Sequence, residues 1–323
     1  MDGEMIKMQN PLLKIEKLNL SYGGELVTAD VNLEVYPGET LAIVGESGCG
    51  KTSLLKAIMG IPDMEIITED GHIFYGGEEL TAMSAAGRKK LFGSNIGMVF
   101  QNPGAAFNPI RSYRKQFAEM LCSHNKFKGK KSFTEMIEYF NKLGLPDGEH
   151  ILNSCPYEMS GGMNQRIAIA AAILLMPRLL LLDEPTSALD VSTQKSVLDE
   201  LQSLKEYADT TIILVTHNLG VAAKIADNTG VMYAGRLIEY GKTSEILHFP
   251  LHPYTRSLVA SVPKPDGKRS VGLKGQMPLY GAAMPGCAFY MRCPLRVDAC
   301  KNRKYELAKI KSEHYACCME SEK

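Results

Sequence analysis

The strongest constraint on the fold is the run GESGCGKT at Gly45–Thr52. The apolar run Leu41–Val44 precedes it, and Leu54, Leu55 and Ile58 follow it at helical spacing. This order predicts a buried parallel strand, a glycine-rich loop and a helix, which is the setting of the pattern G-x-x-x-x-G-K-[ST]. We therefore expect an α/β protein built around a parallel sheet.

The chemistry of this loop predicts a phosphate site. Glycines let the backbone curl so that consecutive N–H groups point at phosphate oxygens, and the helix N-terminus adds partial positive charge. We expect Lys51 to reach the β- and γ-phosphates and Thr52 to ligate Mg²⁺. Cys49 occupies a free position of the pattern, and we interpret it as a small residue and not as a nucleophile.

Two further strand ends carry residues that suit phosphate chemistry. Residues 178–190 read RLLLLDEPTSALD, which predicts a second buried strand with Asp183 and Glu184 at its carboxyl end. We expect Asp183 to hold Mg²⁺ and Glu184 to accept a proton from the attacking water. Residues 211–220, TIILVTHNLG, predict a third strand followed by His217, which we expect at the γ-phosphate, positioning that water.

The composition supports an ordinary globular protein. The chain has 323 residues, 45% hydrophobic and 22% charged, which is enough for one large or two to three small domains. Its formal net charge is zero, so no polybasic face favours a nucleic-acid partner. There is no signal-peptide pattern, and the longest apolar run, Ile167–Met176, is shorter than the roughly 20 residues of a membrane span. We expect a soluble, intracellular chain with mostly reduced cysteines.

A second anion site is predicted at Ser160–Gly162, where a serine and two glycines precede a helical stretch. With this motif in place, the order of motifs resembles the ATP-binding subunits of ABC transporters, over nearly the whole chain. The resemblance implies that these three residues, the signature of the family, bind the γ-phosphate held by an opposite subunit, so that ATP lies between two chains. It also implies that Tyr22 stacks on adenine and that Gln101 senses Mg²⁺ and links to membrane subunits. The loop Ser187–Asp190 would cross the dimer interface.

The resemblance supplies a full set of expected site residues. The expected ATP contacts are Tyr22, Gly45, Glu46, Ser47, Gly48, Cys49, Gly50, Lys51, Thr52, Ser53, Gln101, Ser160, Gly161, Gly162 and Asp190. The expected Mg²⁺ ligands are Thr52, Gln101 and Asp183, and the expected catalytic residues are Lys51, Glu184 and His217. Met163 and Asn218 depart from the family's common glutamine and aspartate, and neither is a group expected to do chemistry.

The resemblance also implies the organisation of the chain. The predicted fold class is α/β: a P-loop NTPase core of ABC type, with an N-terminal antiparallel β subdomain, an inserted helical subdomain and a small cysteine-containing C-terminal extension. The predicted parts are a nucleotide-binding core (1–103), a helical subdomain ending in the signature (104–166), the rest of the core (167–247) and the extension (248–323).

Local signals within the helical subdomain give two further predictions. The spacing Ser132-x-x-Glu135 predicts a capping box at the start of a helix. Cys122 and Cys155 are expected to be small buried hydrophobic residues.

The C-terminal extension narrows the resemblance to one group of importers within the family. Residues 252–263, HPYTRSLVASVP, resemble the extension of ATP-binding subunits of oligopeptide, dipeptide and nickel importers. Downstream lie Cys287, Cys293, Cys300 and Cys317, and four thiolates can hold an iron–sulfur cluster or Zn²⁺. A [4Fe–4S] cluster is our first expectation, because some importers of this family carry one at this place. Zinc and uncomplexed or disulfide-linked thiols remain alternatives, and Cys318 can replace Cys317 as the fourth ligand.

The sequence thus predicts the ATP-hydrolysing subunit of an ABC importer that drives uptake of peptides. Nickel or a metal chelate is the alternative solute. A soluble ABC ATPase acting on DNA or the ribosome is the alternative from another class, although the sequence has no sustained heptads and no second P-loop. Intact Lys51, Glu184 and His217 argue against a third possibility, a non-hydrolysing regulatory subunit.

The same resemblance implies the partners and the location. We expect a second, related ATP-binding subunit, with a heterodimer favoured over a homodimer, and two membrane-spanning permease subunits. An extracytoplasmic solute-binding protein is an indirect partner, and nucleic acid is not expected. The expected location is peripheral, on the cytoplasmic face of the inner membrane.

Overall fold

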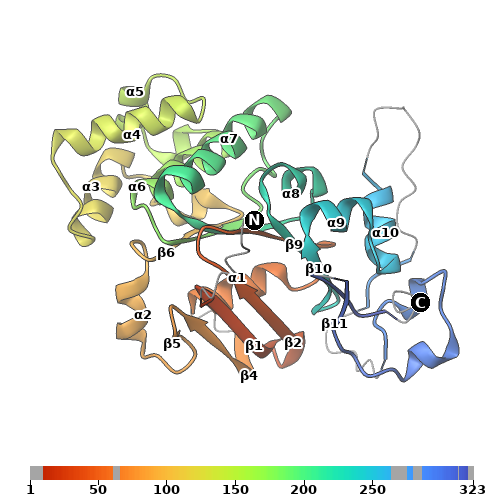
Figure 1. Cartoon of the computed structure of the whole chain (residues 1–323). Coiled ribbons are helices and arrows are strands. Elements are labelled where there is room, and N and C mark those ends of the chain that lie inside the picture. Colours follow the sequence, from red (N-terminus) through yellow and green to blue (C-terminus); the bar gives the residue numbers. More distant parts are fainter. Residues whose placement is uncertain (1–9, 61–65, 263–274, 279–285, 312, 319–323) are drawn as a thin grey trace, which may run out of the picture.

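The computed structural model describes residues 10–60, 66–262, 275–278, 286–311 and 313–318 (Figure 1). The strands are β1 (Leu13–Tyr22), β2 (Glu25–Val35), β3 (Thr40–Val44), β4 (Ile66–Tyr75), β5 (Glu78–Glu79), β6 (Ile96–Val99), β7 (Leu179–Asp183), β8 (Thr211–Thr216), β9 (Asn228–Tyr233), β10 (Arg236–Lys242), β11 (Ala308–Lys311) and β12 (His314–Ala316). The α-helices are α1 (Lys51–Met59), α2 (Ala85–Leu91), α3 (Tyr113–Ser123), α4 (Lys130–Lys142), α5 (Gly148–Asn153), α6 (Gly161–Leu174), α7 (Val191–Ala208), α8 (Leu219–Ile225), α9 (Thr243–His248) and α10 (Pro253–Ala260). The 3₁₀ helices are η1 (Pro103–Ala106), η2 (Pro156–Glu158), η3 (Tyr290–Arg292) and η4 (Asp298–Lys301).

The larger sheet contains the three strands predicted from the sequence. Its order is β11-β12-β10-β9-β3-β8-β7-β6, and the strands from β9 to β6 are parallel. All residues of β3, β7 and β8 are buried, which explains why these strands read as runs of leucine, isoleucine and valine. Val44 pairs with Thr216 and Asp183 with Val215, so the carboxyl ends of the three strands lie together at one edge.

The smaller sheet is antiparallel, with the order β2-β1-β4-β5. Helix α1 packs between the two sheets, because Leu54, Leu55 and Ile58 share one hydrophobic core with Leu13 of β1 and Ile43 of β3. The predicted α/β core with an N-terminal antiparallel β subdomain is therefore confirmed.

The helical part, α3 to α6, lies to one side of the sheets (Figure 1). A second hydrophobic core, which includes Phe117, Phe140 and Ile167, joins it to the parallel sheet through Leu180 and Leu182. Helix α6 runs without a break across residue 166, where the sequence-based boundary between the helical subdomain and the core falls.

The capping box predicted for Ser132 and Glu135 is wrong. Helix α4 begins at Lys130, because Gly129 turns the chain with a φ of 63°. Ser132 is therefore already inside the first turn, where its buried hydroxyl accepts a hydrogen bond of 2.8 Å from the backbone N–H of Lys128.

The expected burial of the two cysteines in this part is also wrong. Cys122 is exposed and Cys155 is half-buried. The buried residues of α3 are Tyr113, Phe117 and Leu121, which recur every fourth position, and Cys122 lies one residue beyond that stripe.

The C-terminal module, residues 286–311 and 313–318, extends the parallel sheet at its far edge (Figure 1, blue). Tyr240 of β10 pairs with Tyr315 of β12. Glu239 is fully buried in β10, where its carboxylate accepts the backbone N–H groups of Leu251 and His252 at 2.7 and 2.8 Å. The same carboxyl group lies 2.8 Å from Nε2 of His314, so one buried side chain joins the module to the core.

An aromatic cluster makes the second attachment of this module. The ring of Tyr233 in β9 lies 4.6 Å from that of Tyr254 in α10 and 5.3 Å from that of Phe289, between ring centroids. These rings belong to one hydrophobic core with Cys293. The two attachments together show why the module has a fixed place on the sheet.

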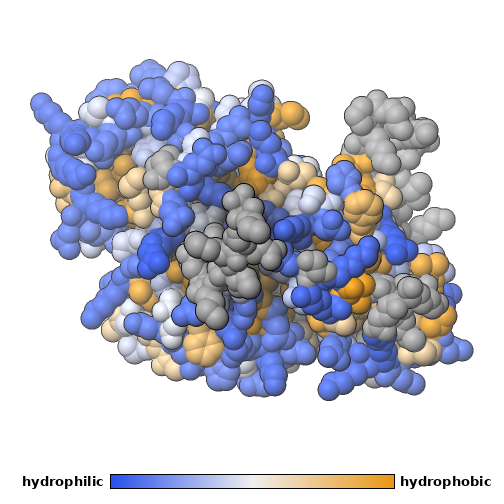
Figure 2. Space-filling model, in the orientation of Figure 1, coloured by the Kyte–Doolittle hydropathy of each residue, from blue (hydrophilic) through white to orange (hydrophobic). Residues whose placement is uncertain are grey.

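The visible face of the molecule is mostly hydrophilic, with hydrophobic residues gathered on the C-terminal module and beside the helical part (Figure 2). Exposed hydrophobic side chains of the module include Met291, Leu295 and Val297. None of the helices in the described ranges combines the length and apolar character needed to cross a membrane.

His252 gives a testable consequence of this packing. Its Nδ1 accepts the N–H of Tyr254 at 3.1 Å as the cap of α10, and burial lowers the pKa of the imidazole to about 4. Below about pH 6.5 the unfolded chain binds a proton here that the native state does not bind. We expect the unfolding free energy to fall by about 3 kcal/mol between about pH 6.5 and about pH 4 because of this residue.

The matched variant is His252→Asn, since an asparagine side chain can still cap the helix. Denaturant unfolding of both proteins across this pH range should give a shallower pH dependence for the variant. Identical dependences would contradict the assignment of the acid sensitivity to His252.

Candidate nucleotide-binding site

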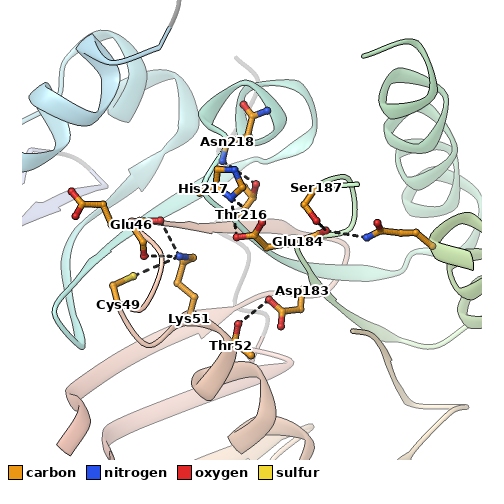
Figure 3. A network of polar contacts seen from close by, with 12 residues as sticks. Glu46, Cys49, Lys51, Thr52, Asp183, Glu184, Ser187, Thr216, His217 and Asn218 are labelled. Carbon is orange, nitrogen blue, oxygen red and sulfur yellow. Dashed lines mark hydrogen bonds and ion pairs between the residues drawn. The ribbon is translucent and has the colours of Figure 1, made fainter. Parts of the chain in front are cut away.

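The glycine-rich loop joins β3 to α1 and closes around Lys51 (Figure 3). Gly50 caps α1 with a φ of 101°, a conformation that a side chain would strain. A side-chain carbon at Gly45 would lie 2.3 Å from the carbonyl oxygen of Met232, so the loop also needs a glycine there. The Lys51 side chain is almost fully buried, and its Nζ donates to the carbonyl oxygens of Gly45 and Glu46, both at 2.9 Å.

The other predicted contacts in the loop differ in exposure. Ser47 and Gly48 are exposed, whereas Ser53, in the first turn of α1, is half-buried. Cys49 is fully buried, and burial raises the pKa of its thiol, which leaves the group protonated and poorly nucleophilic.

Thr52 and Asp183 meet at the start of α1. The hydroxyl of Thr52 donates to Oδ1 of Asp183 at 3.0 Å, and Asp183 is the last residue of β7 (Figure 3). Burial raises the pKa of Asp183, and the hydrogen bond from Thr52 opposes that shift. A hydroxyl and a carboxylate side by side are oxygen donors of the kind that Mg²⁺ prefers, so these two residues fit the expected cation.

Glu184 and His217 form a second pair, at the ends of β7 and β8 (Figure 3). Nδ1 of His217 lies 2.9 and 2.8 Å from the two carboxylate oxygens of Glu184. The Glu184 side chain is 10% exposed and that of His217 is 56% exposed, so the pair opens to solvent on the histidine side. The backbone of Glu184 has a φ of 49°, which is rare for a residue with a side chain.

Gln165 was not singled out by sequence reasoning. It lies in α6 with no exposed surface, and its Nε2 donates to the backbone carbonyl of Glu184 at 3.0 Å. The hydroxyl of Ser187 donates to the same carbonyl at 3.1 Å. The two bonds hold Glu184 in its unusual backbone conformation. The local sequence gives no clear signal for this role, because Gln165 lies between two other polar residues, Asn164 and Arg166.

The signature residues begin α6. The hydroxyl of Ser160 accepts the backbone N–H of Met163 at 3.3 Å as the helix cap, and Ser160 and Gly161 are exposed. A side-chain carbon at Gly162 would lie 3.3 Å from the carbonyl oxygen of Ala188, so this glycine packs against the loop that follows β7.

The remaining predicted residues lie near the surface. Tyr22, at the end of β1, is 46% exposed, and Gln101 is exposed after β6. Asp190 caps α7 by accepting the backbone N–H groups of Ser192 and Thr193, each at 3.0 Å, and these hydrogen bonds with both hydroxyls hold its pKa well below the usual range.

The C-terminal cysteines share one cavity of about 30 Å³. Its lining includes Cys287, Cys293, Cys300, Cys317 and Cys318. Burial raises the pKa values of the first, second and fourth of these thiols, that of Cys287 to about 11. Within the described ranges, however, no three histidine, cysteine, aspartate or glutamate residues are arranged to hold a metal ion. The predicted ligands are thus gathered without forming a coordination sphere.

Known proteins resemble the chain over most of its length. Residues 28–187 match the ABC transporter family, and residues 238–300 match the oligopeptide/dipeptide transporter C-terminal region. The dipeptide transport ATP-binding protein DppD of Bacillus subtilis is 38% identical over 311 residues, which is 94% of this chain and 92% of that protein. The oligopeptide transport ATP-binding protein OppD of the same organism is 38% identical over 312 residues, 94% of this chain and 87% of that protein.

A solved structure agrees with these matches. The dimeric ATP-binding cassette MJ0796 in a post-hydrolysis state, bound to ADP and Pi, superposes with a TM-score of 0.64 at 26% identity. The superposition covers 72% of this chain and 98% of that one. The chain therefore belongs to the ABC transporter family, as an ATPase of its oligopeptide/dipeptide branch.

Proposed function

We propose that this chain is the ATP-hydrolysing subunit of an importer that takes up peptides through separate membrane subunits. The observation that carries this proposal is the meeting of Lys51, the Thr52–Asp183 pair and the Glu184–His217 pair at one sheet edge. The peptide as solute is supported by the names of the relatives and by the match of the C-terminal region.

Each of these residues has a proposed part in binding ATP. The triphosphate enters the loop, and the Lys51 ammonium exchanges the carbonyl oxygens of Gly45 and Glu46 for phosphate oxygens. Thr52, Asp183 and Gln101 would hold Mg²⁺, and the cation would neutralise charge on the phosphates. Burial raises the pKa of Asp183, and a bound cation would stabilise the charged form of this carboxylate.

Hydrolysis is assigned to the Glu184–His217 pair. The carboxylate of Glu184 accepts a proton from water while the water oxygen attacks the γ-phosphorus and the bond to the β-phosphate oxygen breaks, giving ADP and phosphate. His217 holds the carboxylate through Nδ1, and its second ring nitrogen remains for the γ-phosphate. Gln165 and Ser187 fix the backbone from which the carboxylate projects.

The exposure of the signature residues supports an assembly of two ATP-binding chains. Ser160 and Gly161 are exposed at the N-terminus of a 14-residue helix, where an anion from another subunit can reach the helix N–H groups. We propose that they bind the ATP of a second, related ATP-binding subunit, with Asp190 and its loop and Tyr22 also at the nucleotide. A heterodimer is the favoured assembly.

Glu184→Gln tests the assignment of the general base. An amide cannot accept the proton, so we expect the turnover number to fall about 10²- to 10⁴-fold while ATP binding persists and an ATP-bound dimer accumulates. Phosphate release and light scattering in MgATP measure the two effects. Glu206→Gln, on the exposed side of α7, is the matched control and should keep wild-type turnover. Undiminished turnover in Glu184→Gln would refute this role.

An apolar groove beside Gln101 is the proposed contact with the membrane subunits. It has a volume of about 270 Å³ and runs between β6, α3 and α6. Its lining includes Met59, Phe107, Met120, Ala168 and Ala172. We propose that a short cytoplasmic helix of a permease subunit lies in it, because an amphipathic helix can bury its apolar face in such a groove. The chain would then work peripherally on the cytoplasmic face of the inner membrane, with a solute-binding protein acting outside.

Ala172→Glu tests this groove. A carboxylate there should prevent docking of an apolar helix face, because the charge would have to be buried without a partner. We expect loss of copurification with the permease subunits and wild-type ATP hydrolysis by the isolated chain. Ala223→Glu makes the same change at an exposed position of α8 and should copurify normally. Normal copurification of Ala172→Glu would show that the permeases bind elsewhere.

We further propose that Cys287, Cys293, Cys300 and either Cys317 or Cys318 hold a [4Fe–4S] cluster, with Zn²⁺ as the alternative. The support is that these thiols share one cavity. Metal binding requires them to draw together and to lose their protons, which their raised pKa values disfavour until a metal is present.

Metal analysis of the anaerobically purified chain tests the cysteine proposal. We expect about four iron and four sulfide per chain and absorbance near about 400 nm, both lost in Cys293→Ser. Cys122→Ser removes an exposed thiol of α3 and should retain the iron. Stoichiometric zinc without iron would support the alternative, and a chain free of both metals would contradict metal binding.

A further inference from the structure

An arginine of the C-terminal module contacts the nucleotide loop directly. Arg292 is the last residue of η3 and precedes Cys293. Its Nη1 donates to Oε2 of Glu46 and its Nη2 to Oε1 of Glu46, each at 3.0 Å. The two residues are 246 positions apart in the chain. A fork of two parallel hydrogen bonds fixes direction as well as distance, so Glu46 has one defined orientation.

The surroundings lock the arginine in place. The Arg292 side chain is 6% exposed, and its Nη1 also donates to the hydroxyl of Tyr233 at 3.3 Å. The centre of the guanidinium lies 5.7 Å from the Tyr233 ring centroid and 5.8 Å from that of Phe289. A lysine would keep the charge but lose the fork and the flat contact with the rings.

A second residue of the extension holds the backbone of the same loop residue. The hydroxyl of Tyr254, in α10, accepts the backbone N–H of Glu46 at 3.0 Å. Figure 3 shows the carboxylate of Glu46 pointing away from Lys51 and Thr52, so it is directed out of the proposed phosphate site. Arg292 and Tyr254 of the extension therefore contact the loop on the side that faces away from the phosphate site.

The contact with the extension also affects the phosphate side of the loop, because Glu46 makes contacts on both sides. The carbonyl oxygen of Glu46 accepts from Nζ of Lys51 at 2.9 Å, while its carboxylate is held by Arg292. A loop that is already curled loses less conformational freedom when phosphates bind, and that saving appears as affinity. Removing Arg292 leaves the loop to be ordered at the moment of binding.

We propose that Arg292 is a positioning residue for the ATP site, which holds Glu46 and thereby pre-forms the loop of residues 45–50 for the triphosphate. This inference rests on the ATP hydrolysis proposed above. It makes the C-terminal module part of the machinery that binds ATP, in addition to any metal that its cysteines hold.

The test is the steady-state kinetics of Arg292→Gln in the full chain. We expect KM for MgATP to rise between about 3- and 30-fold, with the turnover number at saturating ATP changed less than about 2-fold, since Glu184 and His217 are untouched. Arg292→Lys should fall between this variant and wild type. Arg256→Gln makes the same change at an exposed residue of α10 and should leave both parameters unchanged.

A double-mutant cycle with Glu46→Gln identifies the pair. We expect Glu46→Gln alone to raise KM similarly. The KM of the double variant should be no higher than that of the single variant with the higher KM. Additive effects, or a folded Arg292→Gln with wild-type KM, would overturn the inference. If melting curves show that Arg292→Gln does not fold, Glu46→Gln carries the test alone, and a wild-type KM in that variant overturns the inference.

Binding of a fluorescent ATP analogue to the same proteins separates this inference from the proposed function. Wild-type protein that binds the analogue but hydrolyses no ATP contradicts the proposed function only. Equal affinities of wild type and Arg292→Gln contradict the role of Arg292, whether or not ATP is hydrolysed.

Discussion

The in-register parallel pairing of β3, β8 and β7 is the constraint on which the rest of the structure depends. It sets Val44 beside Thr216 and Asp183 beside Val215, so three chain segments end at one sheet edge. This pairing brings together the loop before Lys51, the carboxylates at the end of β7 and His217. The three segments are far apart in the sequence. Because all three strands are buried, their register is held by the core and not by the site.

Most of this arrangement could be predicted, because its signals are local. Four consecutive leucines before Asp183 and a β-branched run before His217 indicate buried strands, and GESGCGKT indicates the loop and helix between which phosphate binds. The predicted capping box at Ser132 is wrong for a reason that is also local. Gly129, and not Ser132, turns the chain into α4.

What could not be predicted depends on distant partners or on strain. The left-handed backbone of Glu184 is held by Gln165, 19 residues away, and nothing in the local sequence announces it. Arg292 and Glu46 are further apart still, and each looks like an ordinary surface charge in the sequence. The cysteines were recognised as a group, yet their spacing does not say whether they form a coordination sphere, and in the described ranges they do not.

We propose that ATP hydrolysis at this sheet edge drives the uptake of peptides. The most direct measurement is accumulation of a labelled peptide in vesicles that contain the two permeases, the partner ATPase, the solute-binding protein and this chain. Uptake should require MgATP and should cease when Glu184→Gln replaces the wild-type chain. ATP-dependent accumulation of nickel and not of peptide, or peptide uptake that is indifferent to this chain, would contradict the claim.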